Sequence, residues 1–99
     1  MLIEFDPYAQ IELEEATLYY DNISSKLGNT FLDAVERTLN RIVNFPDAWT
    51  PMIQNARRCH IDGFPYGIVY RVYGEKIQIL AVMHLQRKPN YWIDRKIEK

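Results

Sequence analysis

The sequence predicts an α+β fold in which a helical hairpin packs on one face of an antiparallel sheet, in the order β-α-α-β-β-β. Two observations predict it. Residues 7–45 place apolar side chains three and four positions apart, as amphipathic helices do. Residues 57–83 hold short runs rich in Val, Ile and Tyr, which favour strands. With 99 residues and 47% apolar side chains, we expect one domain, residues 1–99, with a small core.

The chain begins with a predicted outer strand, because residues 2–5 alternate between apolar and polar side chains. Asp6-Pro7 then indicates a helix start, with Asp at the N-cap and Pro in the first turn. We expect this helix to run to about Ser25. Its apolar stripe consists of Ala9, Leu13, Ala16, Tyr20, Ile23 and Leu27.

A second helix follows after a short link. Gly28 stands where a glycine stop is expected, and Asn29 or Thr30 can cap the next helix. Pro46 ends it. Because the link is short, the two helices should form an antiparallel hairpin. The stripe of the second helix consists of Phe31, Val35, Thr38, Ile42 and Phe45.

Three strands are expected after residues 47–56, a predicted loop that packs Trp49 and Met52 inward. The first is residues 57–61, where Cys59 alternates with polar neighbours and is expected in the core. Asp62-Gly63 indicates a turn. The other two, residues 68–73 and 77–83, flank a glycine-containing break and predict a β-hairpin.

The run at residues 77–83 is apolar at nearly every position, so we predict a central strand that is covered on both faces. The tail, Tyr91–Lys99, is predicted to form a short helix.

Several function classes are disfavoured by composition. The single Cys59 cannot form an internal disulfide, which fits a reducing compartment. No signal peptide or membrane-length apolar run is seen, so a cytoplasmic location without membrane contact is expected. There is no glycine-rich phosphate loop and no G-x-S-x-G elbow. His60 and His84 lack metal-ligand spacing, so neither metal nor cofactor is expected.

The net charge of −1 hides a polarised chain. Residues 1–50 carry three cations and nine acids, whereas residues 51–99 carry nine cations and four acids. The basic half is suited to an anion, a nucleic acid or an acidic partner. The alternative is that the acids simply occupy solvated helix faces.

The candidate site lies just after the central strand, where His84, Arg87 and Tyr91 occur together. An imidazole can move a proton near neutral pH, a guanidinium can hold a phosphate, and a tyrosine can stack on a base. With Arg58 and Arg71 on neighbouring strands, these groups suit phosphodiester cleavage. The alternative is structural, with Tyr91 anchoring the tail on the core.

Further cations are candidates for binding a phosphate, a target or an acidic antagonist: Arg57, Arg58, Arg71 and Lys88. The alternative for the Arg57-Arg58 pair is a solvated strand edge that discourages further sheet pairing.

An ordered set of short patterns covers nearly the whole chain and resembles the RelE/ParE toxin superfamily of type II toxin–antitoxin systems. The patterns are Leu18-Tyr19-Tyr20, residues 27–35 (LG-x-x-F-L-D-A-V), residues 42–46 (I-x-x-F-P), Arg57-Arg58, residues 64–71 (F-P-Y-x-I-x-Y-R) and residues 81–92 (A-V-x-H-x-x-R-x-P-x-Y-W). The resemblance implies the same β-α-α-β-β-β fold. It also implies a growth-arresting bacterial toxin of the plasmid-stabilisation type, neutralised by a cognate antitoxin, as a homodimer or a toxin–antitoxin heterotetramer.

The superfamily divides by target. ParE-like members poison DNA gyrase by binding, whereas RelE-like members cut mRNA on the ribosome with basic groups and a C-terminal Tyr or His. Arg58, Arg71, His84, Arg87 and Tyr91 match positions where the nucleases keep such groups. Those nucleases are strongly basic, as ribosome binding demands, and this chain has a pI of about 6.1. We therefore expect a ParE-like gyrase poison, with an mRNA endonuclease or an inactive antitoxin-binding relic as the alternatives.

Overall fold

The computed structural model describes residues 1–95 and confirms the predicted order of elements. The helices and strands are β1 (Leu2–Phe5), α1 (Pro7–Ile23), α2 (Ser25–Asn44), the short 3-10 helix η1 (Ile53–Asn55), β2 (Arg57–His60), β3 (Tyr66–Tyr73) and β4 (Lys76–His84). The predicted tail helix is not present in residues 91–95, of which residues 91–94 form turns. Its remainder lies outside the described residues.

The four strands form one sheet in the order β1-β4-β3-β2. The pairs β2–β3 and β3–β4 are antiparallel, as predicted. The prediction of a wholly antiparallel sheet is wrong for β1, which runs parallel to β4, with Leu2 opposite Lys76 and Phe5 opposite Ile79. The mixed sheet has a simple cause: the helical hairpin separates β1 from the meander and returns the chain to the far edge, so that β1 pairs with the last strand.

The central position of β4 is confirmed, since residues 77–83 are all buried. The alternation of β4 side chains between the two faces of the sheet is interrupted by a bulge. Val69 is opposite Ala81 and Tyr70 is opposite Ile79, which leaves Leu80 as an extra residue in β4. Ile77, Ile79 and Val82 pack in the core cluster that includes the helices. Leu80, Ala81 and Met83 pack in a second cluster around Trp92. The bulge therefore lets one strand fill two cores.

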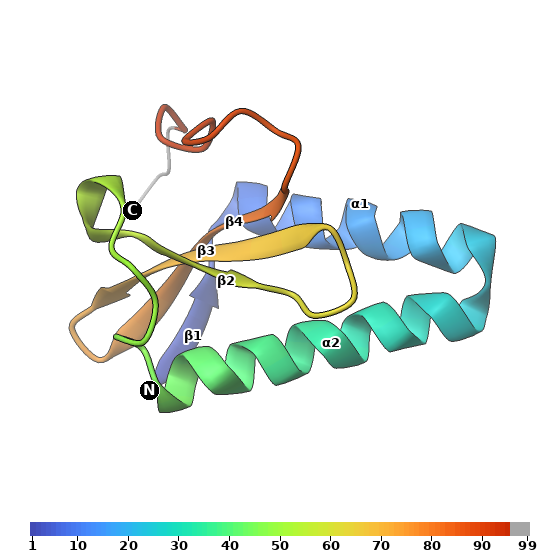
Figure 1. Ribbon diagram of the computed structural model, residues 1–99, viewed down its shortest axis with the longest axis horizontal. Coiled ribbons are helices and arrows are strands. Elements are labelled where there is room, and N and C mark those ends of the chain that lie inside the picture. The colour runs from blue at the N-terminus through green and yellow to red at the C-terminus, as the bar shows by residue number, and fades with distance from the viewer. Residues whose placement is uncertain (96–99) are drawn as a thin grey trace.

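Figure 1 shows the helical hairpin on one side of the sheet and the segment after β4, in red, on the side away from α2. The hairpin prediction is confirmed. Most of the predicted stripes are buried, including Ala16, Tyr20, Phe31 and Ile42. Leu13 and Leu27 are partly buried, and Ile23 and Phe45 are exposed at the ends of the helices.

The boundary between the helices differs from the prediction. The first helix ends at Ile23, and Ser24 caps the second by accepting a hydrogen bond from the Leu27 amide at 3.0 Å. Gly28 is therefore not a helix stop, and Asn29 and Thr30 are not caps, because all three lie inside α2. Gly28 is buried where α2 crosses α1: an added Cβ would lie 3.0 Å from the Asp21 Cα. The glycine is needed for close helix packing rather than for ending a helix.

Candidate functional site

The carboxyl end of β4 positions His84. This residue pairs with Tyr66 across the β3–β4 ladder, and the two rings pack edge to face with centroids 5.0 Å apart. The Nδ1 atom of His84 accepts a hydrogen bond from the Gln86 amide at 3.1 Å. In the neutral imidazole this places the proton on Nε2. His84 is half-buried, so it is held in place but accessible.

Arg87 and Tyr91 lie together, as the sequence predicted. The Arg87 guanidinium carbon lies 3.9 Å from the centre of the Tyr91 ring, a cation–π arrangement. The Tyr91 hydroxyl, however, donates a hydrogen bond to the Glu12 carboxylate. Burial, followed by this hydrogen bond, raises the pKa of Tyr91 well above its ordinary value. The Tyr91 ring thus supports the Arg87 guanidinium, while the Tyr91 hydroxyl is occupied by its hydrogen bond to Glu12.

Glu12 is the centre of a polar network that sequence reasoning missed. Its side chain is only 13% exposed. Besides Tyr91, it accepts hydrogen bonds from both Nη atoms of Arg95 and, at 3.0 Å, from the Val82 amide. Arg95 also donates to the Leu80 carbonyl oxygen at 3.1 Å. These contacts fasten the segment after β4 to α1.

A signal for this network exists in the sequence. Glu12 lies three residues after Ala9 and four before Ala16, so it falls on the buried stripe of α1. A carboxylate on an apolar stripe requires a partner.

A hollow of about 190 Å³ lies between α1 and the end of β4. It brings His84 and Arg87 together, beside Tyr66 and the carboxylates of Glu12 and Glu15. A neighbouring hollow of about 410 Å³ also reaches His84. Of the group predicted from the sequence, His84 and Arg87 line the hollow of about 190 Å³. That hollow also contains two carboxylates, which the sequence analysis did not include.

Arg57 and Arg71, by contrast, are engaged elsewhere. Arg57 donates hydrogen bonds to the carbonyl oxygens of Asp47 and Trp49 and so fixes the loop before β2. Arg71 is opposite Gln78, six residues along β4 from His84, and donates to its side-chain oxygen at 3.1 Å.

Arg58 and Lys88 are exposed. The stem of Arg58 lies over Gly67 on the neighbouring strand, where an added Cβ would approach it to 3.0 Å.

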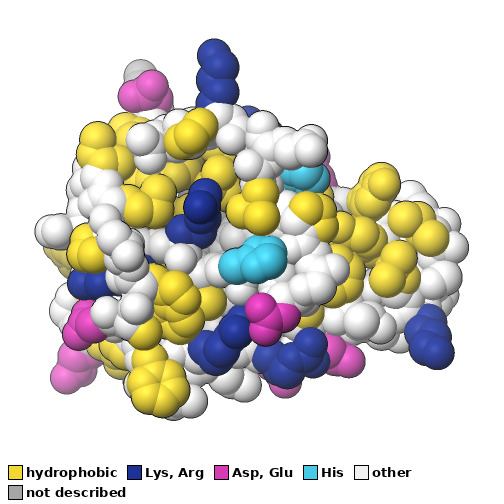
Figure 2. Space-filling model, viewed as in Figure 1, with side chains coloured by type: hydrophobic (Ala, Val, Ile, Leu, Met, Phe, Trp, Pro, Cys, Tyr) yellow, Lys and Arg dark blue, Asp and Glu magenta, His cyan; other side chains and the backbone are white. Residues whose placement is uncertain are grey.

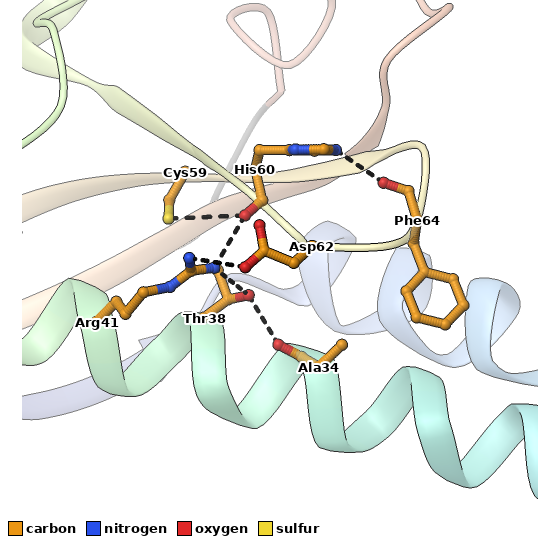
Figure 3. A network of polar contacts seen from close by, with 7 residues as sticks. All are labelled: Ala34, Thr38, Arg41, Cys59, His60, Asp62 and Phe64. Carbon is orange, nitrogen blue, oxygen red and sulfur yellow. Dashed lines mark hydrogen bonds and ion pairs between the residues drawn. The ribbon is translucent and has the colours of Figure 1, made fainter.

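A second polar network, shown in Figure 3, joins α2 to the turn after β2. Arg41 binds the Asp62 carboxylate at 3.1 Å and the His60 carbonyl oxygen at 3.1 Å. The His60 ring contacts the Phe64 carbonyl oxygen at 2.9 Å. Cys59 beneath it is buried, as predicted, and burial raises the pKa of its thiol. A raised pKa disfavours the thiolate, so Cys59 is unsuited to nucleophilic chemistry.

No group of three or more His, Cys, Asp or Glu side chains among residues 1–95 could hold a metal ion. No helix in the same range is long and apolar enough to cross a membrane.

Comparison with known proteins decides the family. The model of the ParE toxin of the type II toxin–antitoxin system, parDE, matches residues 3–89. The chain belongs to the ParE toxin family. The resemblance to the RelE/ParE superfamily is confirmed, and so is its ParE-like branch: the protein is the toxin component of a type II toxin–antitoxin system.

Two relatives of this ParE-family chain are proteins named Toxin ParE2, from two strains of Mycobacterium tuberculosis (CDC 1551 / Oshkosh and ATCC 25618 / H37Rv). Each is 36% identical over 83 residues, which cover 80% of this chain and 76% of the relative. A solved structure of the chromosomal ParDE system from P. aeruginosa matches with a TM-score of 0.72 at 18% identity, covering 85% of this chain and 95% of the other. At that identity the match supports the fold alone. Membership in a ParDE-type family implies a cognate antitoxin as partner.

Proposed function

We propose that this ParE-family toxin arrests growth by binding DNA gyrase and not by cutting mRNA. The observation that carries the proposal is that side chains needed for cleavage already form hydrogen bonds within the protein. The Tyr91 hydroxyl is bonded to Glu12, and Arg71 is bonded to Gln78 at a distance of six residues from His84 along β4. General acid–base cleavage needs such groups within hydrogen-bond reach of one phosphate.

Electrostatics support the same proposal. The hollow that holds His84 and Arg87 is also lined by Glu12 and Glu15. Glu12 is paired with Arg95, but the Glu15 carboxylate opposes the approach of a polyanion, whereas ribosome-directed binding depends on many cation–phosphate contacts. The formal net charge of −1 gives no compensating long-range attraction.

The test is expression of the toxin in a bacterium, with plasmid supercoiling and mRNA 5′ ends measured in the same culture. Gyrase poisoning should change supercoiling and leave the mRNA ends as in the uninduced culture. Discrete new 5′ ends with normal supercoiling would overturn the proposal. Growth without either effect would identify an inactive relic that only binds its antitoxin.

One observation favours mRNA cleavage as a second candidate: His84 and Arg87 line the same hollow. If they act on a phosphodiester, His84→Ala and Arg87→Ala should each lower cleavage by roughly 10²-fold or more, as loss of a proton-transfer group does. Arg37→Ala, at an exposed arginine on α2, serves as the matched control.

We further propose that the antitoxin covers the apolar side chains that α1 leaves exposed. Ile11, Leu18, Tyr19 and Ile23 are each more than half exposed. Figure 2 shows hydrophobic side chains gathered at the end of the molecule where α1 meets α2, on the right of the view. Exposed apolar patches mark interaction surfaces, and an amphipathic helix or an extended segment is the usual occupant.

A charge placed in this patch tests the proposal. Leu18→Glu should weaken binding of the co-expressed antitoxin by at least about tenfold, since a carboxylate would be desolvated at the interface. Gln10→Glu adds the same charge at another exposed site on α1 and should leave affinity unchanged. Equal affinity for both variants would place the antitoxin elsewhere. The mass of the purified complex distinguishes a heterodimer from the heterotetramer that the family resemblance implies.

A further inference from the structure

A third hollow, of about 200 Å³, lies near the other end of β4. Its polar lining comes from Gln54, Arg71, Gln78, Trp92 and Arg95. Within the described part of the chain, it shares no lining residue with the hollows at His84. The segment after β4 provides Trp92 and Arg95, whereas Arg71 lies on β3 and Gln78 on β4.

Two N–H groups in the lining have no acceptor among the residues that the structure describes. Trp92 is only 4% exposed, and neither its Nε1 nor the Nε of Arg71 has a hydrogen-bond partner among residues 1–95. Both atoms are donors only. Buried N–H groups without an acceptor are rare in proteins, so two that line one hollow indicate a missing ligand that accepts hydrogen bonds.

The charges around the hollow favour an anion. Arg71 forms no ion pair with a carboxylate in the described part of the chain, whereas the charge of Arg95 is matched by Glu12. No carboxylate among residues 1–95 lines the hollow. The nearest acid in the hydrogen-bond chain is Asp6, which is linked to Arg71 only through the Gln78 amide. That amide also fixes the guanidinium in one orientation.

We propose that this hollow binds one phosphate-type oxyanion, which accepts hydrogen bonds from Trp92 Nε1 and Arg71 Nε. A guanidinium suits the charge and geometry of an oxyanion, and an indole N–H adds a directional donor. The volume is several times the roughly 30 Å³ that one water takes in the liquid, so a tetrahedral anion has room. This inference does not depend on the toxin's target.

Titration with inorganic phosphate tests the proposal directly. The full-length, ¹⁵N-labelled chain is titrated at constant ionic strength, with sodium chloride replaced by sodium phosphate at fixed pH. The indole N–H resonance of Trp92 should shift and saturate, while that of Trp49, which does not line the hollow, should stay in place. A shift that does not saturate, or equal shifts of both indoles, would overturn the proposal and indicate a hollow that holds water only.

Conservative variants assign the donors. Arg71→Lys keeps the positive charge but removes Nε and should weaken phosphate binding by roughly tenfold or more. Arg37→Lys makes the same change at an exposed arginine on α2, outside the hollow, and should leave binding unchanged. Trp92→Phe keeps an aromatic ring without the N–H and should abolish the rise in Tm that phosphate gives the native chain. If Arg71→Lys binds phosphate as tightly as the native chain, the assignment is wrong, whatever the stability of Trp92→Phe.

Discussion

The hydroxyl of Tyr91 donates a hydrogen bond to the carboxylate of Glu12, which lies 79 positions earlier in the chain. The same carboxylate is paired with Arg95 and accepts from the Val82 amide. One acid on α1 thus holds the central strand and the segment that covers the second face of the sheet. The candidate site at His84 is built on this anchor, because Glu12 also lines its hollow.

Glu12→Gln should lower the free energy of unfolding by about 3 kcal/mol. Both charged side chains are 13% exposed, and removing one partner of a largely buried pair leaves the other charge uncompensated. Urea unfolding at pH 7 measures the loss. The control is Glu14→Gln, because Glu14 is exposed and should change stability by less than about 0.5 kcal/mol. Equal losses for the two variants would contradict the anchoring role.

Stability should also fall at alkaline pH. Burial raises the pKa of Tyr70 to about 12, and the pKa of Tyr91 is raised by burial and by Glu12. Both phenols therefore hold their protons more tightly in the folded chain than in the unfolded chain, where the pKa is about 10. Their contribution is complete below pH 10 and is lost as the pH rises from about 10 towards 12.

For Tyr70 the loss approaches roughly 2–3 kcal/mol at pH 12. Tyr70→Phe should reduce the fall in stability between pH 10 and 12, measured by denaturant unfolding at several pH values. Tyr8→Phe, at an exposed tyrosine, is the control and should keep the native pH dependence. A Tyr70→Phe variant with the native alkaline slope would contradict the burial argument.

The sequence predicted what depends on local pattern. The stripe through Phe31 and Ile42 and the nearly continuous apolar run of β4 both predict burial from the local sequence, and the structure confirms both. The prediction for Gly28 is wrong because a glycine that ends a helix and one that allows a close helix crossing look alike in a single sequence. Only the contact with Asp21 distinguishes them.

The pairing of strands that are far apart in the sequence could not be predicted from local sequence patterns. Nothing near residues 2–5 specifies a parallel partner 74 positions later, although the register places Leu2 opposite Lys76. For the site, the proximity of His84 and Arg87 follows from their short separation in sequence and was predictable. The register that places Arg71 opposite Gln78, and so away from His84, was not.

Ala81→Asp should prevent folding. Ala81 is fully buried in the cluster around Trp92, and an unpaired charge there costs several kcal/mol, a large part of the stability of a small domain. Loss of the folded circular dichroism spectrum and of a thermal transition would show this. The matched control is Ala48→Asp, the same change in an exposed loop, which should fold normally. A folded Ala81→Asp protein would contradict the two-sided burial of β4.

Gly28→Ala should destabilise the helical hairpin. The new Cβ would lie 2.8 Å from the Asp21 Oδ1 atom and 3.0 Å from its Cα, and overpacking of this kind costs about 1–3 kcal/mol. Alanine regains about 1 kcal/mol of helix propensity, so a net loss of roughly 1 kcal/mol is expected in thermal unfolding. Asn29→Ala, at the next and exposed position, should be neutral or stabilising. A more stable Gly28→Ala protein would show that the helices do not approach so closely.

The most direct test of the gyrase proposal is a supercoiling assay with purified DNA gyrase and relaxed plasmid, in which the toxin chain and its variants are added without other cellular components. The chain should inhibit supercoiling, and addition of its antitoxin should restore it. His84→Ala should inhibit as the native chain does, because binding needs no proton transfer. Full supercoiling activity in the presence of the native toxin, together with cleavage of mRNA on purified ribosomes that His84→Ala abolishes, would contradict the account.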